Sequence, residues 1–229
     1  MQNETANNAD SNNDLKSLEV EIREAVASGV HVRETVHRLT LKAINAERVD
    51  LDSIQRIITA AMQGIHDGAS QRFQQINYQA HTAKVQISDA VAGLDSALAS
   101  FAEASKLALE EAAGNAKKFS ETELARARAD LESLEQLFLD TLHRTATTAK
   151  GLMADILHDL SRHAANHGTA VGMQLKETLA ALAQQIAAVG QAQLMAGTSL
   201  AHATADFVNK IASGVLAGIN EKKRNNQSH

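Results

Sequence analysis

Two stretches near the middle of the chain carry the pattern that decides its fold. Residues 87–101 read ISDAVAGLDSALASF, and residues 131–142 read LESLEQLFLDTL. Apolar side chains recur in both at spacings of three and four residues, which places them on one narrow face of an α-helix. These positions are Ile87, Val91, Leu94, Leu98, Phe101, Leu131, Leu134, Phe138 and Leu142. The pattern predicts two amphipathic helices, each with an apolar interaction face.

The segment between these stretches contains the signals of a helix start. Ser120 is suited to cap a helix, and Glu123 stands where its carboxylate can reach back to complete a capping box. Phe119 and Leu124 occupy the two positions of a hydrophobic staple. We therefore expect two helices that meet at a hinge.

The composition favours long helices and excludes several other classes. The chain of 229 residues has no Pro, Trp or Cys and one Tyr, whereas average usage would supply about ten prolines. Pro is the strongest helix breaker, and few residues here favour strands or fill a broad core, so we expect an elongated all-α protein. The absence of Cys excludes disulfides and thiolate metal sites.

Charge and the N-terminal sequence narrow the cellular context. The net charge is −5 with 21% charged residues, which is too balanced for a dedicated nucleic-acid-binding protein. Residues 1–13 are rich in Asn and have no apolar run, so they match neither a signal peptide nor a transit peptide. We expect a cytoplasmic protein that binds no nucleic acid.

Helix start and stop signals divide the chain into four parts. They are a disordered lead at 1–13, short N-terminal helices at 14–66, a long-helix bundle at 67–220 and a polar basic tail at 221–229. Three segments of similar length, 69–114, 120–166 and 169–219, fill the bundle region, each about 70 Å long at about 1.5 Å per residue. We expect an elongated antiparallel bundle of three long amphipathic helices, preceded by two or three shorter helices.

Short-range signals set the expected boundaries in the N-terminal part. Gly29 is a plausible helix stop, and Asp50 resembles an N-cap for the helix that follows it. Between them a helix is expected at about 32–46. Gly64 and Gly68 weaken the next helix and mark a soft boundary.

The last predicted helix carries a third apolar stripe. Its members in the interaction face are Leu179, Leu182, Ile186 and Phe207. No charged residue lies between Glu177 and Asp206, which invites a membrane-spanning interpretation. However, Gln, Thr, Ser and His interrupt the run, whereas a spanning helix needs about 20 predominantly apolar residues. We expect no transmembrane span, and favour a helix that is buried between partners or lies at a membrane interface.

Histidines and known catalytic motifs give little support to an enzyme. His163 and His167 are four residues apart, with His143 and His158 upstream, but a zinc site needs further ligands. Histidines at a helix end that face solvent or are partly buried are the favoured interpretation. No phosphate-binding loop, dinucleotide fingerprint or nucleophile motif occurs. We therefore expect no catalysis, no cofactor and no bound metal.

A family resemblance begins at residues 99–114, which read ASFAEASKLALEEAAG, and continues through 119–142. This Ala-rich, Pro-free and Cys-free amphipathic sequence with sparse Phe and Leu resembles phasins, bacterial helical proteins that coat polyhydroxyalkanoate granules. The resemblance covers about residues 85–160, and 14–66 have no counterpart in that family. The chain also resembles an uncharacterised group of proteobacterial all-helical proteins, which implies no activity.

Two functions from different classes follow from these observations. The first is a non-catalytic protein whose amphipathic helices associate with a lipid or polyester granule surface, as the resemblance to phasins implies. It would lie in the cytoplasm, at granules or at the inner membrane. The alternative is a structural or scaffolding protein of coiled-coil type, which buries its stripes in a bundle or in a homo-oligomer. About ten apolar residues give on the order of 10 kcal/mol of gross burial energy in either setting, so energy alone does not choose between them.

Overall fold

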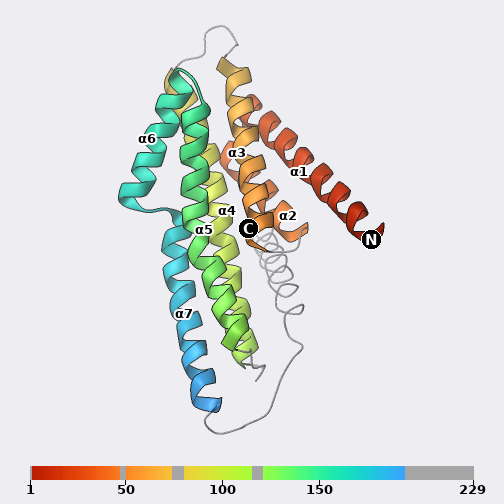
Figure 1. Cartoon of the computed structure of the whole chain (residues 1–229). Helices are drawn as coiled ribbons and strands as arrows, with labels where there is room; N and C mark the ends of the chain where they lie inside the picture. The colour runs from red at the N-terminus through yellow and green to blue at the C-terminus, as the bar shows by residue number, and fades with distance from the viewer. Residues whose placement is uncertain (1, 47–49, 74–79, 115–120, 194–229) are drawn as a thin grey trace, which may run out of the picture. The chain divides into compact units, whose positions relative to one another are not determined.

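A computed structural model (Figure 1) describes residues 2–46, 50–73, 80–114 and 121–193, and the side chains of 12–46, 50–73, 81–108 and 125–184. Within these ranges the backbone forms helices joined by short turns and contains no strand. The helices are α1 (Gln2–Ser28), α2 (Val32–Ala46), α3 (Leu51–Phe73), α4 (Ala80–Gly114), α5 (Glu121–Thr148), α6 (Leu152–His167) and α7 (Ala170–Gln193). The all-α class is therefore confirmed.

Contacts divide the chain into two units, each of which draws on two separated parts of the sequence. The first unit comprises Met1–Leu98 with Gln136–Ala170, and the second comprises Ala99–Glu135 with Val171–His229. Helices α4 and α5 each contribute one part to each unit. This division does not follow the boundary between residues 66 and 67 that the sequence signals predict.

Glycines bring α1 and α3 close together in the first unit. A Cβ at Gly64 would lie 2.5 Å from the backbone oxygen of Glu19, and a Cβ at Gly68 would lie 2.5 Å from that of Arg23. Any larger residue would push the two backbones apart, so these glycines permit close packing. Because the residue numbers rise together, α1 and α3 run in the same direction, side by side in Figure 1.

Both ends of α2 lie where the local signals place them. Gly29 directly follows α1 and has a φ of 70°, which glycine adopts without steric cost. Beyond the other end of α2, the Asp50 carboxylate accepts the backbone N–H of Ser53 at 2.7 Å and so caps α3. The helix predicted at about 32–46 is confirmed.

The first part of α4 packs against α2 and lies beside α6. A Cβ at Gly93 would lie 2.5 Å from the backbone oxygen of Arg33, so glycine also permits the contact between α4 and α2. On α6, Asp159 Oδ2 lies 4.0 Å from the ammonium nitrogen of Lys84 on α4. The second part of α5 completes the unit with its buried Phe138 and Leu142.

The second unit joins the later part of α4, the earlier part of α5, and α7. The buried Thr178 hydroxyl on α7 donates to the carbonyl oxygen of Ala102 on α4 at 2.9 Å. Lys106 Nζ also lies 3.3 Å from Glu177 Oε2. Buried apolar residues of this unit include Phe101, Leu131, Leu134, Leu175 and Leu182.

The continuous helix predicted at 120–166 is wrong, because α5 and α6 are separated at residues 149–151. The Thr148 hydroxyl lies 3.2 Å from the carbonyl oxygen of Arg144, where it competes for the acceptors of the last helical turn. Gly151 then has φ 58° and ψ −143°, a conformation that residues with side chains rarely adopt. A bundle of three long helices is therefore not found in the described residues.

Two predicted boundaries in the first half of the chain also differ from the structure. The soft boundary at Gly64 and Gly68 does not end a helix, since α3 continues to Phe73. The long helix predicted from residue 69 therefore begins later, at Ala80. Glycines separated by four residues lie on the same helix face, where they serve packing.

The segment 1–13, predicted as disordered, is helical from Gln2 onward. Neither Gly nor Pro interrupts the sequence before Gly29, so a helix nucleated further along can extend towards the N-terminus. The predicted cap and staple at Ser120 and Phe119 lie outside the described residues, as do residues 194–219 of the last predicted helix.

Candidate functional site

The predicted interaction face lies inside the first unit where α4 and α5 pass through it. Leu94, Leu98 and Leu142 have no exposed surface, and Ile87 and Phe138 are each 1% exposed. Val91, on the same face of α4, is also buried. The three-and-four spacing thus identified residues that pack against neighbouring helices.

The same face continues inside the second unit. Phe101 on α4 and Leu131 and Leu134 on α5 are buried, as is Leu182 on α7. Leu179 is half-buried. The side chain of Ile186 and the whole of Phe207 lie outside the described residues.

Large apolar side chains are sparse on the described exterior. The exposed ones are Val30, Val85, Leu107, Leu152 and Met173. Scattered apolar residues of this kind are normal on a soluble surface and do not by themselves mark a binding site. Any partner that binds the apolar stripes must therefore gain access to the interior of a unit.

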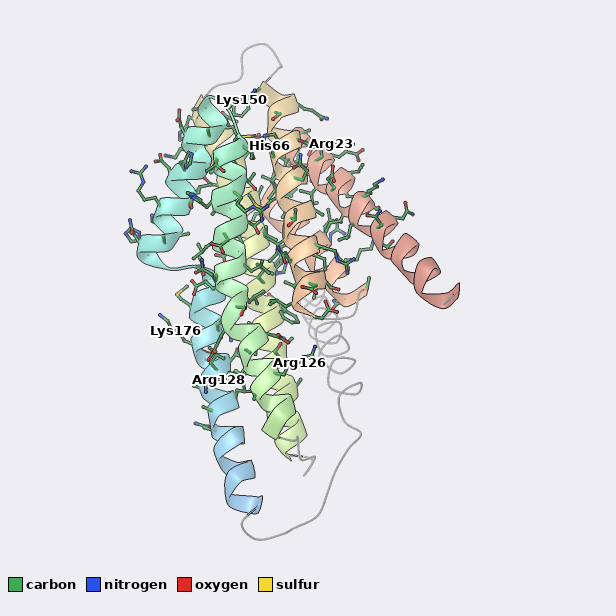
Figure 2. All side chains as sticks on the ribbon, in the orientation of Figure 1. Arg23, His66, Arg126, Arg128, Lys150 and Lys176 are labelled. Atoms are coloured by element: carbon green, nitrogen blue, oxygen red, sulfur yellow. The ribbon has the colours of Figure 1, made fainter. Side chains whose placement is uncertain are left out.

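The exposed charges are mixed in sign. Arg126, Arg128 and Lys176 are exposed cations of the second unit (Figure 2). The Arg128 Nε donates to Glu132 at 2.6 Å, one helical turn further along α5. Such pairs stabilise a solvated helix face by about 0.2–0.5 kcal/mol and give no single-sign surface for nucleic acid.

The histidines form two ring contacts in the first unit. His163 and His167 stack with their centroids 4.3 Å apart, and His143 meets His158 edge-on at 6.1 Å. The Nδ1 of His167 also lies 3.1 Å from the carbonyl oxygen of His163, at the end of α6. In the residues whose side chains are described, no group of three or more His, Asp or Glu is arranged to hold a metal ion.

An open groove of about 480 Å³ lies in the first unit, between the start of α2 and the start of α4. Its lining includes His31, Arg33, Glu34 and Asp89. His31 has a φ of 47°, an uncommon value for a residue with a side chain, and its Nδ1 lies 3.9 Å from Oε2 of the exposed Glu34. The lining is mixed in charge, with Arg33 beside Glu34 and Asp89.

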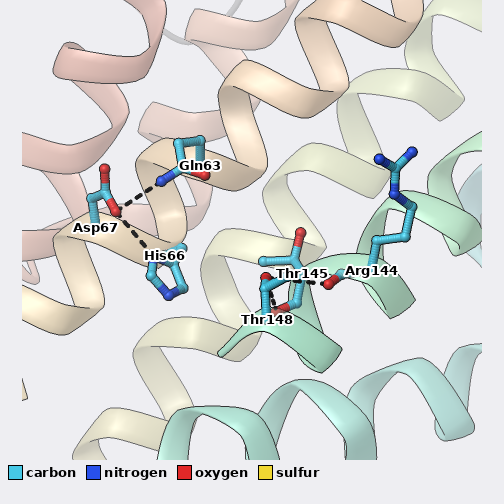
Figure 3. A network of polar contacts seen from close by, with 6 residues as sticks. All are labelled: Gln63, His66, Asp67, Arg144, Thr145 and Thr148. Carbon is cyan, nitrogen blue, oxygen red and sulfur yellow. Dashed lines mark hydrogen bonds and ion pairs between the residues drawn. The ribbon is translucent and has the colours of Figure 1, made fainter. Parts of the chain in front are cut away.

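The polar groups drawn in Figure 3 bond within their own helices. Asp67 accepts from Gln63 at 3.0 Å and lies 2.9 Å from His66 Nδ1, all on α3. Thr148 bonds to carbonyl oxygens of the preceding turn of α5. These are the short-range contacts expected of polar residues on helices, and they assemble no proton-transfer chain between helices.

Several contacts between helices could not be located by apolar periodicity. Asp95 on α4 accepts the backbone N–H of Ala170 at 2.7 Å, which satisfies a free donor at the start of α7. Arg72 on α3 donates to the carbonyl oxygen of Ala27 at 2.8 Å, near the end of α1. Each contact joins residues at least 45 positions apart in the sequence, and single-helix patterns do not reveal such pairings.

Asp95→Ala is expected to lower the free energy of unfolding by about 0.5–2 kcal/mol, the usual loss when a helix N-cap is removed. Asp95→Asn should lose less, because an amide oxygen also accepts the N–H of Ala170. Urea unfolding followed by circular dichroism at 222 nm measures both. Asp89→Ala on the same helix is the matched control, and an equal loss for Asp89 and Asp95 would contradict the cap.

In the part of the chain that the structure describes, no helix combines the length and the apolar character needed to cross a bilayer. No curated protein and no solved structure matches the chain. A family model does match, over residues 8–224, and its description is a family of unknown function, DUF6781. The match covers nearly the whole sequence, so the chain belongs to the DUF6781 family.

Proposed function

We propose that this is a non-catalytic helical protein that associates reversibly with a lipid or polyester granule surface. The observation that supports the proposal is the continuous apolar stripe of α4, which runs from Ile87 to Phe101 and is built from moderately apolar residues. Its resemblance in sequence to phasins points to the same class of surface. The protein would then lie in the cytoplasm, at granules or at the inner membrane.

Surface association of this kind requires the helices to exchange one set of apolar contacts for another. The stripe is buried in the folded chain, since Leu94 and Leu98 have no exposed surface. Burial against a neighbouring helix and burial at an apolar surface yield similar free energies, about 25 cal/mol per Å². The free-energy cost of separating the helices is therefore offset when they bind the surface. The exchange is reversible, and the stripes stay closed in solution.

Flotation tests this proposal. Purified protein is mixed with phosphatidylcholine vesicles, phosphatidylcholine-coated triolein droplets or amorphous polyhydroxybutyrate granules, and then centrifuged through a density gradient. The protein is expected to move with at least one kind of particle and to keep its helical circular dichroism. Protein that remains wholly soluble with all three, at unchanged mass and helicity, would overturn the proposal.

Two substitutions on α7 provide a matched comparison. Leu179 belongs to the apolar stripe and is half-buried, whereas Met173 is 65% exposed and lies off the stripe. Leu179→Ser is expected to reduce the bound fraction severalfold, and Met173→Ser to leave it nearly unchanged. Equal effects from the two would show that the stripe is not the binding face.

A structural or scaffolding role through helix–helix oligomerisation is the second candidate. The observation that favours it is that helices of the same chain already cover the stripes, with backbone atoms of α1 and α2 beside Gly68 and Gly93, which leaves the outer surfaces for contacts with other copies. Such a protein keeps its stripes closed and works through contacts between copies. Light scattering across a hundredfold concentration range would then give a stable mass of two or more chains, with no flotation in the experiment above.

A further inference from the structure

Helix α6 is bounded at both ends by glycines in unusual conformations. Gly151 precedes it with φ 58° and ψ −143°, and Gly168 follows it with φ 84° and ψ 172°. No atom lies within 4 Å of the position a Cβ would occupy at either glycine. Packing therefore does not require glycine at these sites, in contrast to Gly64 on α3. What both ends of α6 share is a positive φ, which glycine adopts without steric cost.

Few residues of α6 are buried in the first unit. Met153, Ile156 and Leu157 are its buried residues, three of sixteen, whereas α3 buries ten of twenty-three. Its ion pair to α4 is long, with 4.0 Å between Lys84 Nζ and Asp159 Oδ2, and both side chains are more than half exposed. Exposed ion pairs of this kind contribute little to stability.

The closest partner of Asp159 is on α6 itself. Arg162 donates to Asp159 at 2.6 Å, so the carboxylate remains paired when α6 moves. Helix α6 also contacts α5 through the rings of His158 and His143, whose centroids are 6.1 Å apart. These two side-chain contacts of α6 with α4 and α5 are therefore longer than the close approach that glycine permits between the backbones of α1 and α3.

The apolar and polar residues of α6 are cleanly separated around the helix. Met153, Ile156 and Leu157 lie on one side, and Asp155, Asp159 and Arg162 on the opposite side. With neutral histidines, Lys150 and Arg162 balance Asp155 and Asp159, so the segment 150–167 has no net charge. A segment without net charge and with a narrow apolar face fits an uncharged apolar surface, because it gains no attraction from anionic headgroups.

We propose that α6 is the helix that opens, turning about Gly151 and Gly168 to lay Met153, Ile156 and Leu157 on an uncharged apolar surface such as a phosphatidylcholine-coated oil droplet. This inference rests on the proposed surface association and assigns its first step to one element, before the stripes of α4 and α7 exchange their contacts. The links at 149–151 and 168–169 span at most about 10 Å and 7 Å when extended. They let α6 roll outward while α4 and the start of α7 keep their places.

A covalent tether between α6 and α4 gives the first test. The chain has no Cys, so Lys84→Cys with Asp159→Cys introduces two thiols and no others. The two native side chains reach within 4.0 Å of each other, so a short bismaleimide can span the thiols. The tethered protein is expected to bind phosphatidylcholine-coated triolein droplets at least tenfold less than the same variant with both thiols capped by N-ethylmaleimide.

A fluorescent label gives a second test that does not depend on the tether. Leu152 on α6 and Val85 on α4 are 41% and 45% exposed, so a polarity-sensitive dye attached to Cys at either site starts in a similar environment. On addition of droplets the dye at residue 152 is expected to shift to the blue and brighten, while the dye at residue 85 changes little. Replacing one third of the phosphatidylcholine by phosphatidylglycerol should alter binding less than twofold at neutral pH.

The outcomes separate the two proposals. If the capped variant binds droplets and the tethered one binds equally well, or if the dyes at residues 85 and 152 respond alike, α6 is not the element that opens, while surface association stands. If neither form binds any particle, both proposals fail. If the protein binds polyester granules alone, with the same loss on tethering, the uncharged surface on which α6 lies is polyester. If binding rises steeply with anionic lipid, the proposal of an uncharged surface is overturned.

Discussion

Phe138→Asp is expected to abolish the native fold in solution. Phe138 on α5 is the largest fully buried side chain of the described residues and is 1% exposed. Removing the ring alone costs about 3–5 kcal/mol, and the carboxylate adds the cost of placing an unpaired charge in an apolar interior. The sum is comparable with the whole stability of a typical protein, about 5–15 kcal/mol. Circular dichroism during heating should show no cooperative transition near the wild-type temperature.

Two companion variants make that result specific. Phe138→Leu keeps an apolar side chain at the site and should retain a cooperative transition at a lower temperature. Ala129→Asp introduces the same carboxylate at an exposed position of the same helix and should cost less than about 1 kcal/mol. If Phe138→Asp melts like the wild type, the stripe of α5 is open in solution, and the closed first unit is wrong.

The double substitution Gly64→Ala and Gly68→Ala is expected to produce the second-largest loss. Each new Cβ would lie 2.5 Å from a backbone oxygen of α1, and a backbone atom has no rotamer by which to move away. Overpacking costs about 1–3 kcal/mol at a site, and Gly→Ala in a helix returns about 1 kcal/mol of helix propensity. For the pair these terms leave a net loss of about 0–4 kcal/mol. The upper half of that range is expected because both obstructing atoms belong to the backbone. Urea unfolding measures the loss.

Gly172→Ala on α7 is the matched control for the glycine pair. The three atoms nearest to a Cβ there all belong to the end of the Glu135 side chain, which has rotamers by which to move, unlike a backbone oxygen. We expect this variant to change stability by less than about 1 kcal/mol. A glycine pair as stable as the wild type would contradict the close contact between α1 and α3.

Apolar periodicity and helix-end chemistry predicted the parts of the fold that depend on local sequence. The stop at Gly29, the cap at Asp50 and the break between the segments 120–166 and 169–219 each depend on residues within about one helical turn of the helix end concerned. The stripe residues, such as Leu94 and Leu142, are buried because any arrangement of helices must cover such a face. Periodicity identifies a buried face without naming its partner.

The wrong helix boundaries have a different cause. The interactions that decide them involve residues far away in the sequence, which a search for local helix signals does not include. Gly64 and Gly68 suggested a weak helix end, whereas α1 approaches at that point and makes glycine a packing residue. The four-residue spacing of the two glycines was the signal that could have revealed it. At residues 149–151 the apolar stripe continues in register, and only the Thr-rich end of α5 together with Gly151 indicates a break.

For the same reason, the sequence does not predict which helices are joined by each polar contact. Asp95 is an ordinary acidic residue in the sequence of α4, and its bond to Ala170 spans 75 positions. Thr178 looks like a residue that weakens a run of apolar side chains, yet it is fully buried and bonded to Ala102. Such roles depend on tertiary neighbours, which a single sequence does not specify.

The interrupted sequence of the first unit has a consequence for biosynthesis. Met1–Leu98 emerges from the ribosome well before its remaining part, Gln136–Ala170, with which it shares a core. At about 5–20 residues per second, translation of the intervening and completing segments takes about 4–14 seconds. During that interval the nascent chain carries apolar helix faces without their final cover. A chaperone that shields such faces should therefore engage ribosome-bound chains that end between residues 98 and 170, and release them once Ala170 has emerged.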